Sequence, residues 1–182
     1  GLGDVYKRQI LYYIFYIIQY LYKYPKDDLE IAAYYQIAKC YEKLENWDLA
    51  NHPNQKDAGS FIKHNWEVLA ENGMLKIVDG KDQFINGVDI LISFGHTDGL
   101  MHPLISDGNS TLFFGSDIFP LATHVHIPWV MAYDIKPLVT LKEKEFFLRK
   151  ILEEDWILFF EHDPHIQAAK IHKDKHKYTV KE

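Results

Sequence analysis

Three short apolar runs, each followed at once by a histidine or an aspartate, restrict the fold of this chain more than any other feature of its sequence. The runs are VDILISF before Gly95 and His96, TLFFGS before Asp117, and WILFFE before His162. Short apolar runs bounded by glycine or turn residues are typical of β-strands, and the strands of one sheet bring their ends to a common edge. The sequence therefore predicts a sheet that carries three polar side chains at one rim.

The segment between the second and third runs predicts an amphipathic helix. Thr140 and Glu143 match the T-x-x-E pattern of a capping box, which places the start of the helix at Thr140. A buried stripe is predicted from residues at helical spacing: Phe147, Leu148, Ile151 and Leu152. A further helix is predicted upstream from Phe61, Ile62, Trp66 and Leu69. Strands alternating with helices indicate a layered α/β domain.

Composition excludes several classes of protein. The 182 residues are 47% hydrophobic, enough for one core, and the net charge of −6 disfavours a nucleic acid as partner. Cys40 is the single cysteine, so no internal disulfide can form and a cytoplasmic location is expected. A small molecule is the expected partner, and the oligomeric state is left open.

The two ends of the chain differ from its middle. Residues 1–24 read GLGDVYKRQ followed by a nearly continuous apolar run, which is too short for the roughly 20 residues that span a bilayer and lacks a signal-peptide cleavage pattern. GLGDVYKRQ resembles a read-through tail found at the ends of assembled sequences, so we expect a non-native leader and a fragmentary chain. Residues 25–170 are expected to form the α/β domain, and residues 171–182 a solvated charged tail.

The three residues that follow the apolar runs share one chemical property. Imidazole nitrogen and carboxylate oxygen are ligands that zinc takes at about 2.0 to 2.2 Å, and a carboxylate can bridge two ions. A histidine alone at a strand end is more often bonded to a loop carbonyl. Because three such residues are expected at the same rim, the sequence predicts a metal centre of His96, Asp117 and His162.

The motifs around these residues resemble a known family. GHTDG, FFGSD and FFEHDP, in that order, are similar to the C-terminal half of the metallo-β-lactamase-fold hydrolases, which include N-acyl-homoserine lactonases and glyoxalase II. The resemblance implies an αβ/βα sandwich with a two-zinc centre at one edge. It assigns His96 to the first zinc, Asp117 to both zinc ions and His162 to the second.

One motif of that family is absent from this sequence. The family carries an upstream H-x-H-x-D-H run, whereas here His52 and His64 are isolated and the HVH at 124–126 continues without the D-H. About two protein ligands are left for each metal, although a catalytic zinc usually has three and a water. The expectation is an incomplete sandwich and an incomplete metal site in a truncated chain.

The function implied by the resemblance is a zinc-dependent hydrolase that acts on an ester, thioester or lactone carbonyl. Asp117 would position the metal ions, and Tyr133 is the candidate donor to the developing oxyanion, although a tyrosine in WVMAYD also fits a core or pocket wall. Two alternatives remain: a mononuclear-iron oxygenase that uses the same three ligands, and a non-catalytic remnant. His102 is interpreted as a strand-entry or surface residue. His124 and His126 would project on the same side if HVHIP is extended, and they fit either pocket residues or surface and structural residues.

Overall fold

The computed structural model describes residues 51–59, 87–175 and 177–181. The chain divides into two compact units, Gly1–Val78 and Asp79–Glu182. The described part of the first unit includes one short 3-10 helix, η1 (Asp57–Gly59). The predicted leader at 1–24 and the helix predicted around Trp66 lie outside the described residues. Among the residues described, no helix has both the length and the apolarity needed to cross a membrane.

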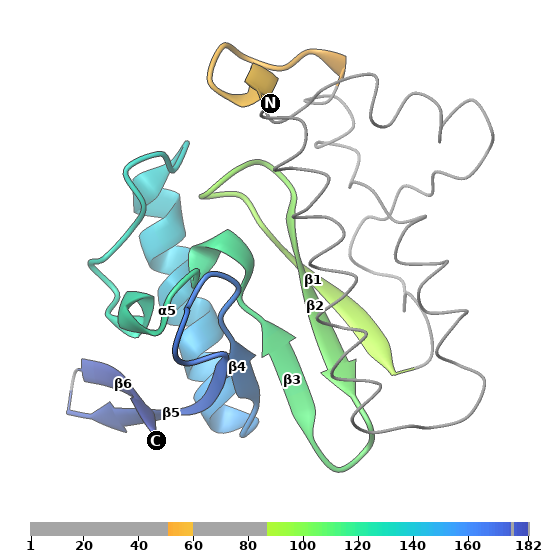
Figure 1. Ribbon diagram of the computed structural model, residues 1–182, viewed down its shortest axis with the longest axis vertical. Helices are drawn as coiled ribbons and strands as arrows, with labels where there is room; N and C mark the ends of the chain where they lie inside the picture. Colours follow the sequence, from red (N-terminus) through yellow and green to blue (C-terminus); the bar gives the residue numbers. More distant parts are fainter. Residues whose placement is uncertain (1–50, 60–86, 176, 182) are drawn as a thin grey trace. The chain divides into compact units, whose positions relative to one another are not determined.

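Among the described residues of the second unit, six strands form one sheet, and their spatial order follows the chain (Figure 1). They are β1 (Val88–Ser93), β2 (Leu100–Ser106), β3 (Thr111–Phe114), β4 (Ile157–Phe159), β5 (Ala168–Asp174) and β6 (Lys177–Lys181). The three strands predicted from the apolar runs are present as β1, β3 and β4, and the expected α/β class is confirmed. β3 and β4 pair in parallel, whereas the other neighbours are antiparallel.

The connection between β3 and β4 carries most of the non-strand structure. A parallel pair needs a crossover, because its strands run in the same direction. Here the crossover contains the 3-10 helices η2 (Ser116–Ile118) and η3 (Ala122–Val125) and the helix α5 (Pro137–Glu153). The HVH run belongs to η3 and its C-terminal end, so the extended HVHIP that would project His124 and His126 on the same side is not present.

The predicted capping box at the start of the helix is also wrong. α5 begins at Pro137, one turn before Thr140, since proline at the first helical position has a preset φ and needs no hydrogen-bond partner for its nitrogen. The Glu143 side chain therefore does not cap the helix. Its carboxylate accepts hydrogen bonds from the backbone N–H groups of Phe94 and Gly95, at 2.7 and 2.9 Å. The helix therefore anchors the end of β1.

Gly95 packs directly against the backbone of α5. A Cβ atom at this position would lie 2.3 Å from the Thr140 nitrogen and 2.5 Å from its Cα, closer than any real contact. The Gly95 carbonyl also accepts the N–H of Lys136, at 2.8 Å. Only glycine allows the turn after β1 to approach the helix this closely, and this approach sets the position of His96.

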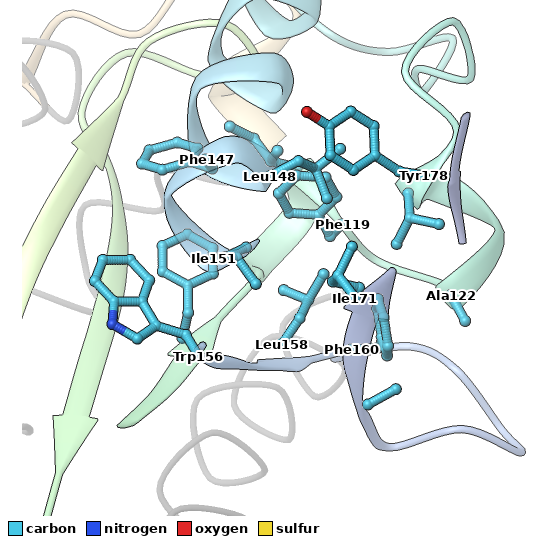
Figure 2. Packing of buried hydrophobic residues seen from close by; sticks show 14 residues of the cluster. Phe119, Ala122, Phe147, Leu148, Ile151, Trp156, Leu158, Phe160, Ile171 and Tyr178 are labelled. Carbon is cyan, nitrogen blue, oxygen red and sulfur yellow. The ribbon is translucent and has the colours of Figure 1, made fainter. Parts of the chain in front are cut away.

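The hydrophobic core lies between α5 and the β3 to β6 side of the sheet (Figure 2). Phe147, Leu148 and Ile151 of α5 are buried against Leu158 of β4 and Ile171 of β5. The helix stripe is thus largely as predicted, except that Leu152 is 39% exposed.

The C-terminal residues belong to the domain. β5 and β6 form an antiparallel hairpin that continues the sheet to Lys181, and Ile171 and Tyr178 are buried in the core (Figure 2). The prediction of a solvated tail over 171–182 is wrong, because alternate apolar residues among the lysines cover the core while residues such as His172 stay exposed.

His102 is an interior residue, which corrects its prediction as a strand-entry or surface histidine. It lies within β2 at 0% exposure and stacks on Phe113 with ring centroids 5.3 Å apart. The Phe114 carbonyl can only accept, so Nδ1 of His102 donates to it at 3.2 Å, while the Ser93 hydroxyl donates to Nε2 at 2.8 Å. Burial lowers the pKa of His102 to about 4, so the ring is neutral at physiological pH.

Candidate metal centre

The three predicted ligands meet at one rim of the sheet. His96 follows β1, Asp117 lies in η2 directly after β3, and His162 follows β4. Nε2 of His96 is 3.4 Å from Oδ2 of Asp117, and Nε2 of His162 is 3.1 Å from Oδ1 of the same carboxylate. Each oxygen of Asp117 therefore faces a different imidazole.

A sharp turn at the end of β3 directs Asp117 to this rim. Ser116 has a φ of 45°, in the left-handed region, and its hydroxyl donates to the Met101 carbonyl at 2.8 Å. Gly115 donates to the Phe159 carbonyl at 3.0 Å, and a Cβ on Gly115 would lie 2.9 Å from that same oxygen. The strand end is thus held on both sides, by Met101 of β2 and by Phe159 of β4, directly before Asp117.

The charges at the rim stabilise one another. Burial opposes ionisation of Asp117, but the hydrogen bond from His162 and the nearby charges of His96 and His162 hold its pKa below the ordinary value. The hydrogen bond to Asp117 raises the pKa of His162 above the usual value for a histidine, against the effect of burial. The surroundings of Asp117 therefore favour its ionised form, with an imidazole on each side of the carboxylate.

Asp134 holds the other side of His96. Oδ1 of Asp134 is 2.8 Å from Nδ1 of His96, and the Asp134 side chain is fully buried. Because a carboxylate accepts, Nδ1 carries the proton and the lone pair of a neutral ring lies on Nε2, which faces Asp117. Histidines that bind metals are oriented in this way by a carboxylate on their second nitrogen. Asp134 was not among the predicted site residues, although it ends the WVMAYD segment.

Glu161 is a second carboxylate that the sequence analysis missed. Its side chain is 11% exposed, and its Oε1 is 3.6 Å from Nε2 of His162. One ligand atom from each of Asp117, Glu161 and His162 lies within 4.8 Å of the others. The signal was the glutamate of FFEHDP, directly before the predicted histidine ligand.

Tyr133 lies beside the centre. Its ring meets the ring of His96 edge to face, with centroids 5.7 Å apart, and the residue is 50% exposed. Tyr133 is therefore part of the rim and not of the core. The loop before it is fixed from below by the buried Lys144 of α5, whose ammonium donates to the carbonyls of His126 and Ile127 at 3.0 Å.

The residues present fit a zinc ion chemically. Two imidazole nitrogens and a shared carboxylate are zinc donors, and their separations of 3.1 and 3.4 Å match neighbouring ligands of one ion with bonds of about 2.0 to 2.2 Å. Within the described part of the chain, Oδ2 of Asp134 is buried without a hydrogen-bond partner, so this carboxylate keeps acceptor capacity next to the site.

Comparison with known proteins places the fold. No protein-family profile and no curated protein matches the sequence. Solved structures do match: a probable metal-dependent hydrolase from Staphylococcus aureus has a TM-score of 0.65 at 23% identity, over 77% of this chain and 51% of that one. The hydrolase AbOPH, of the beta lactamase superfamily, has a TM-score of 0.65 at 15% identity, over 76% and 52%.

A lactonase shares the same fold. AidC, a dizinc quorum-quenching lactonase in complex with a product, has a TM-score of 0.58 at 20% identity, over 73% of this chain and 46% of that one. The chain thus spans about half the length of the structures that it matches. At these identities the likeness concerns the fold.

Proposed function

Since the chain shares the fold of the metallo-β-lactamase-fold hydrolases, we propose that it is a zinc-dependent hydrolase acting on the ester, thioester or lactone carbonyl of a small molecule. The observation that carries the proposal is the placement of Asp117, one oxygen toward His96 and the other toward His162. A small-molecule substrate is further supported by a matching N-acyl homoserine lactone hydrolase that has its product bound at the catalytic metal centre, at 20% identity and a TM-score of 0.52.

The ligand assignment follows from the rim. His96 and Asp117 would hold one zinc ion, and Asp117 and His162 the other. Two ligands are fewer than the three protein ligands of an ordinary catalytic zinc, and the H-x-H-x-D-H run that supplies the rest in the family does not occur in this sequence. Zinc binding by these residues alone is therefore expected to be weak compared with that of a full ligand set.

The residues of the chain have separate tasks in the proposed reaction. When bound, a two-zinc centre polarises a carbonyl and supplies an activated water near neutral pH. Asp134 keeps His96 in the tautomer that points a lone pair at the centre. Glu143 and Gly95 fix the turn that carries His96. Tyr133, exposed at the rim, would donate a hydrogen bond from its hydroxyl to the oxyanion that develops on the substrate.

The test combines metal content with activity. The purified chain is titrated with Zn²⁺ by calorimetry and is assayed, with Zn²⁺ kept in the buffer, on an aryl ester, an acyl thioester and an N-acyl homoserine lactone, beside Asp117→Asn and the exposed control His172→Ala. We expect bound zinc and hydrolysis of at least one substrate by the wild type and by His172→Ala, and loss of both in Asp117→Asn. A single bound iron would favour the oxygenase alternative, and absence of both metal and activity would contradict the proposal. The cytoplasmic location expected from the single cysteine stays a prediction.

A further inference from the structure

We propose that Glu161 is a metal ligand and that Asp117, Glu161 and His162 together form a three-residue site for a divalent cation such as Zn²⁺. The family resemblance assigns Asp117 and His162 but gives no role to Glu161. The inference rests on the proposed function, because it shares two residues with that centre, and it adds the ligand that would complete one of the two zinc sites.

The geometry centres on one imidazole nitrogen. Nε2 of His162 lies 3.1 Å from Oδ1 of Asp117 and 3.6 Å from Oε1 of Glu161. A single N–H can donate well to only one of these oxygens, whereas a cation between the three groups would be bound by all of them. The three ligand atoms fall within 4.8 Å of one another.

The backbone explains how two consecutive side chains reach the same point. Successive residues of a strand point to opposite faces, but β4 ends at Phe159. After it, the N–H of Phe160 bonds the Gln167 carbonyl at 2.8 Å, and the N–H of His162 bonds the Pro120 carbonyl at 2.9 Å. The chain bends between these two bonds, so Glu161 and His162 both lie against Asp117.

Burial and charge favour a cation at this point. The side chains of Glu161 and Asp117 are only 11% and 28% exposed, and two carboxylates that share a partly buried site repel each other. A divalent cation bound between the two carboxylates would relieve this repulsion. Two carboxylates and one imidazole also make three protein ligands, the usual number for a catalytic zinc with an open position.

The test is a titration of the metal-free chain with Co²⁺, followed by visible absorption, and with Zn²⁺, followed by calorimetry. Glu161→Gln is compared with the wild type and with Glu145→Gln, which removes the same charge from an exposed position on α5. We expect Glu161→Gln to weaken Zn²⁺ binding at least about tenfold, the smallest loss typical even of outer-shell partners, and to change the Co²⁺ absorption band. Glu145→Gln should match the wild type.

Two further variants separate the possible results. Glu161→Asp keeps the negative charge but withdraws the carboxylate oxygens by one methylene, and we expect it to change the Co²⁺ absorption band. It provides the test if Glu161→Gln does not fold. His96→Gln lies outside the three-residue site and should keep the ion that depends on Glu161. Equal binding by the wild type, Glu161→Gln and Glu161→Asp would overturn the role of Glu161 and leave the proposed function intact, whereas absence of binding by the wild type would contradict both.

Discussion

His96 and His102 lie close together in the chain and have opposite chemistry. His96, at the end of β1, has a carboxylate on each ring nitrogen: Asp134 at 2.8 Å and Asp117 at 3.4 Å. His102, inside β2, is bonded to the Ser93 hydroxyl and the Phe114 carbonyl, which are both uncharged. The first environment favours a cation next to the ring, and the second keeps the ring neutral. Both rings are largely buried, so exposure does not distinguish them. The hydrogen-bonding partners of a histidine are what distinguish a candidate metal ligand from a structural residue.

The largest expected effect comes from removing the support of His96. Gly95→Ala would place a Cβ 2.3 Å from the backbone nitrogen of Thr140, and a helix backbone cannot move away without losing hydrogen bonds. We expect the free energy of unfolding to fall by more than about 3 kcal/mol, measured by urea denaturation. Gly59→Ala is the control, because among the described residues no atom beyond its chain neighbours lies within 4 Å of its added Cβ. Equal stability of the two variants would show that the turn before His96 is not packed as described.

The interior histidine should make stability depend on pH. Burial lowers the pKa of His102 from 6.5 to about 4, so between these values the unfolded chain binds a proton that the folded chain does not. The neutral ring of His102 therefore contributes fully to the free energy of unfolding above pH 6.5. This contribution decreases by about 3 kcal/mol as the pH drops to 4. Urea denaturation of the wild type and His102→Leu from pH 7 to pH 4 measures this slope. If the two proteins lose stability in parallel, His102 is not the group that titrates.

A smaller effect is expected at the partner of His96. Asp134→Asn removes the carboxylate that orients Nδ1, and loss of such a partner typically costs about 10- to 100-fold in metal affinity, or roughly 1.4 to 2.8 kcal/mol. Calorimetric titration with Zn²⁺ measures the change. Asp98→Asn is the matched control, because Asp98 pairs with Lys136 at the surface and not with His96. Unchanged affinity in Asp134→Asn would remove Asp134 from the centre.

The smallest effect concerns the bond between α5 and the end of β1. Glu143→Gln leaves one acceptor oxygen for the two N–H groups of Phe94 and Gly95, so one buried donor loses a charged acceptor. We expect a loss of about 1 to 2 kcal/mol in the free energy of unfolding, against no measurable loss in Glu145→Gln. Thermal denaturation compares the two, and identical melting would contradict the anchoring role.

The sequence predicted the parts of the fold that depend on local pattern. Apolar runs identified β1, β3 and β4, and the shared rim followed because strands of one sheet end together. Helical spacing found Phe147, Leu148 and Ile151. Two predictions failed because a local pattern was misleading. Glu143 matches a capping box, but its carboxylate binds the residues that follow β1. The lysines around Ile171 indicated a solvated tail, although alternate residues of this strand are buried.

The partners of the centre were beyond local pattern. Asp134 has no spacing rule relative to His96, and it reaches the rim through the crossover between β3 and β4. Glu161 directly precedes a predicted ligand, but its approach to His162 depends on the bend after β4. His102 was missed because Pro103 interrupts the strand pattern of β2, and its burial depends on Phe113 and Phe147 from other elements. Such long-range packing is visible only in three dimensions.

The most direct test of the account is a long-range ¹H–¹⁵N NMR spectrum of the histidine rings before and after addition of Zn²⁺. We expect the Nε2 resonances of His96 and His162 to shift on metal binding, Nδ1 of His96 to stay protonated toward Asp134, and both nitrogens of His102 to be unchanged. Unshifted His96 and His162 resonances, or a shift at His102 in their place, would contradict the claim that the rim of the sheet is a metal centre.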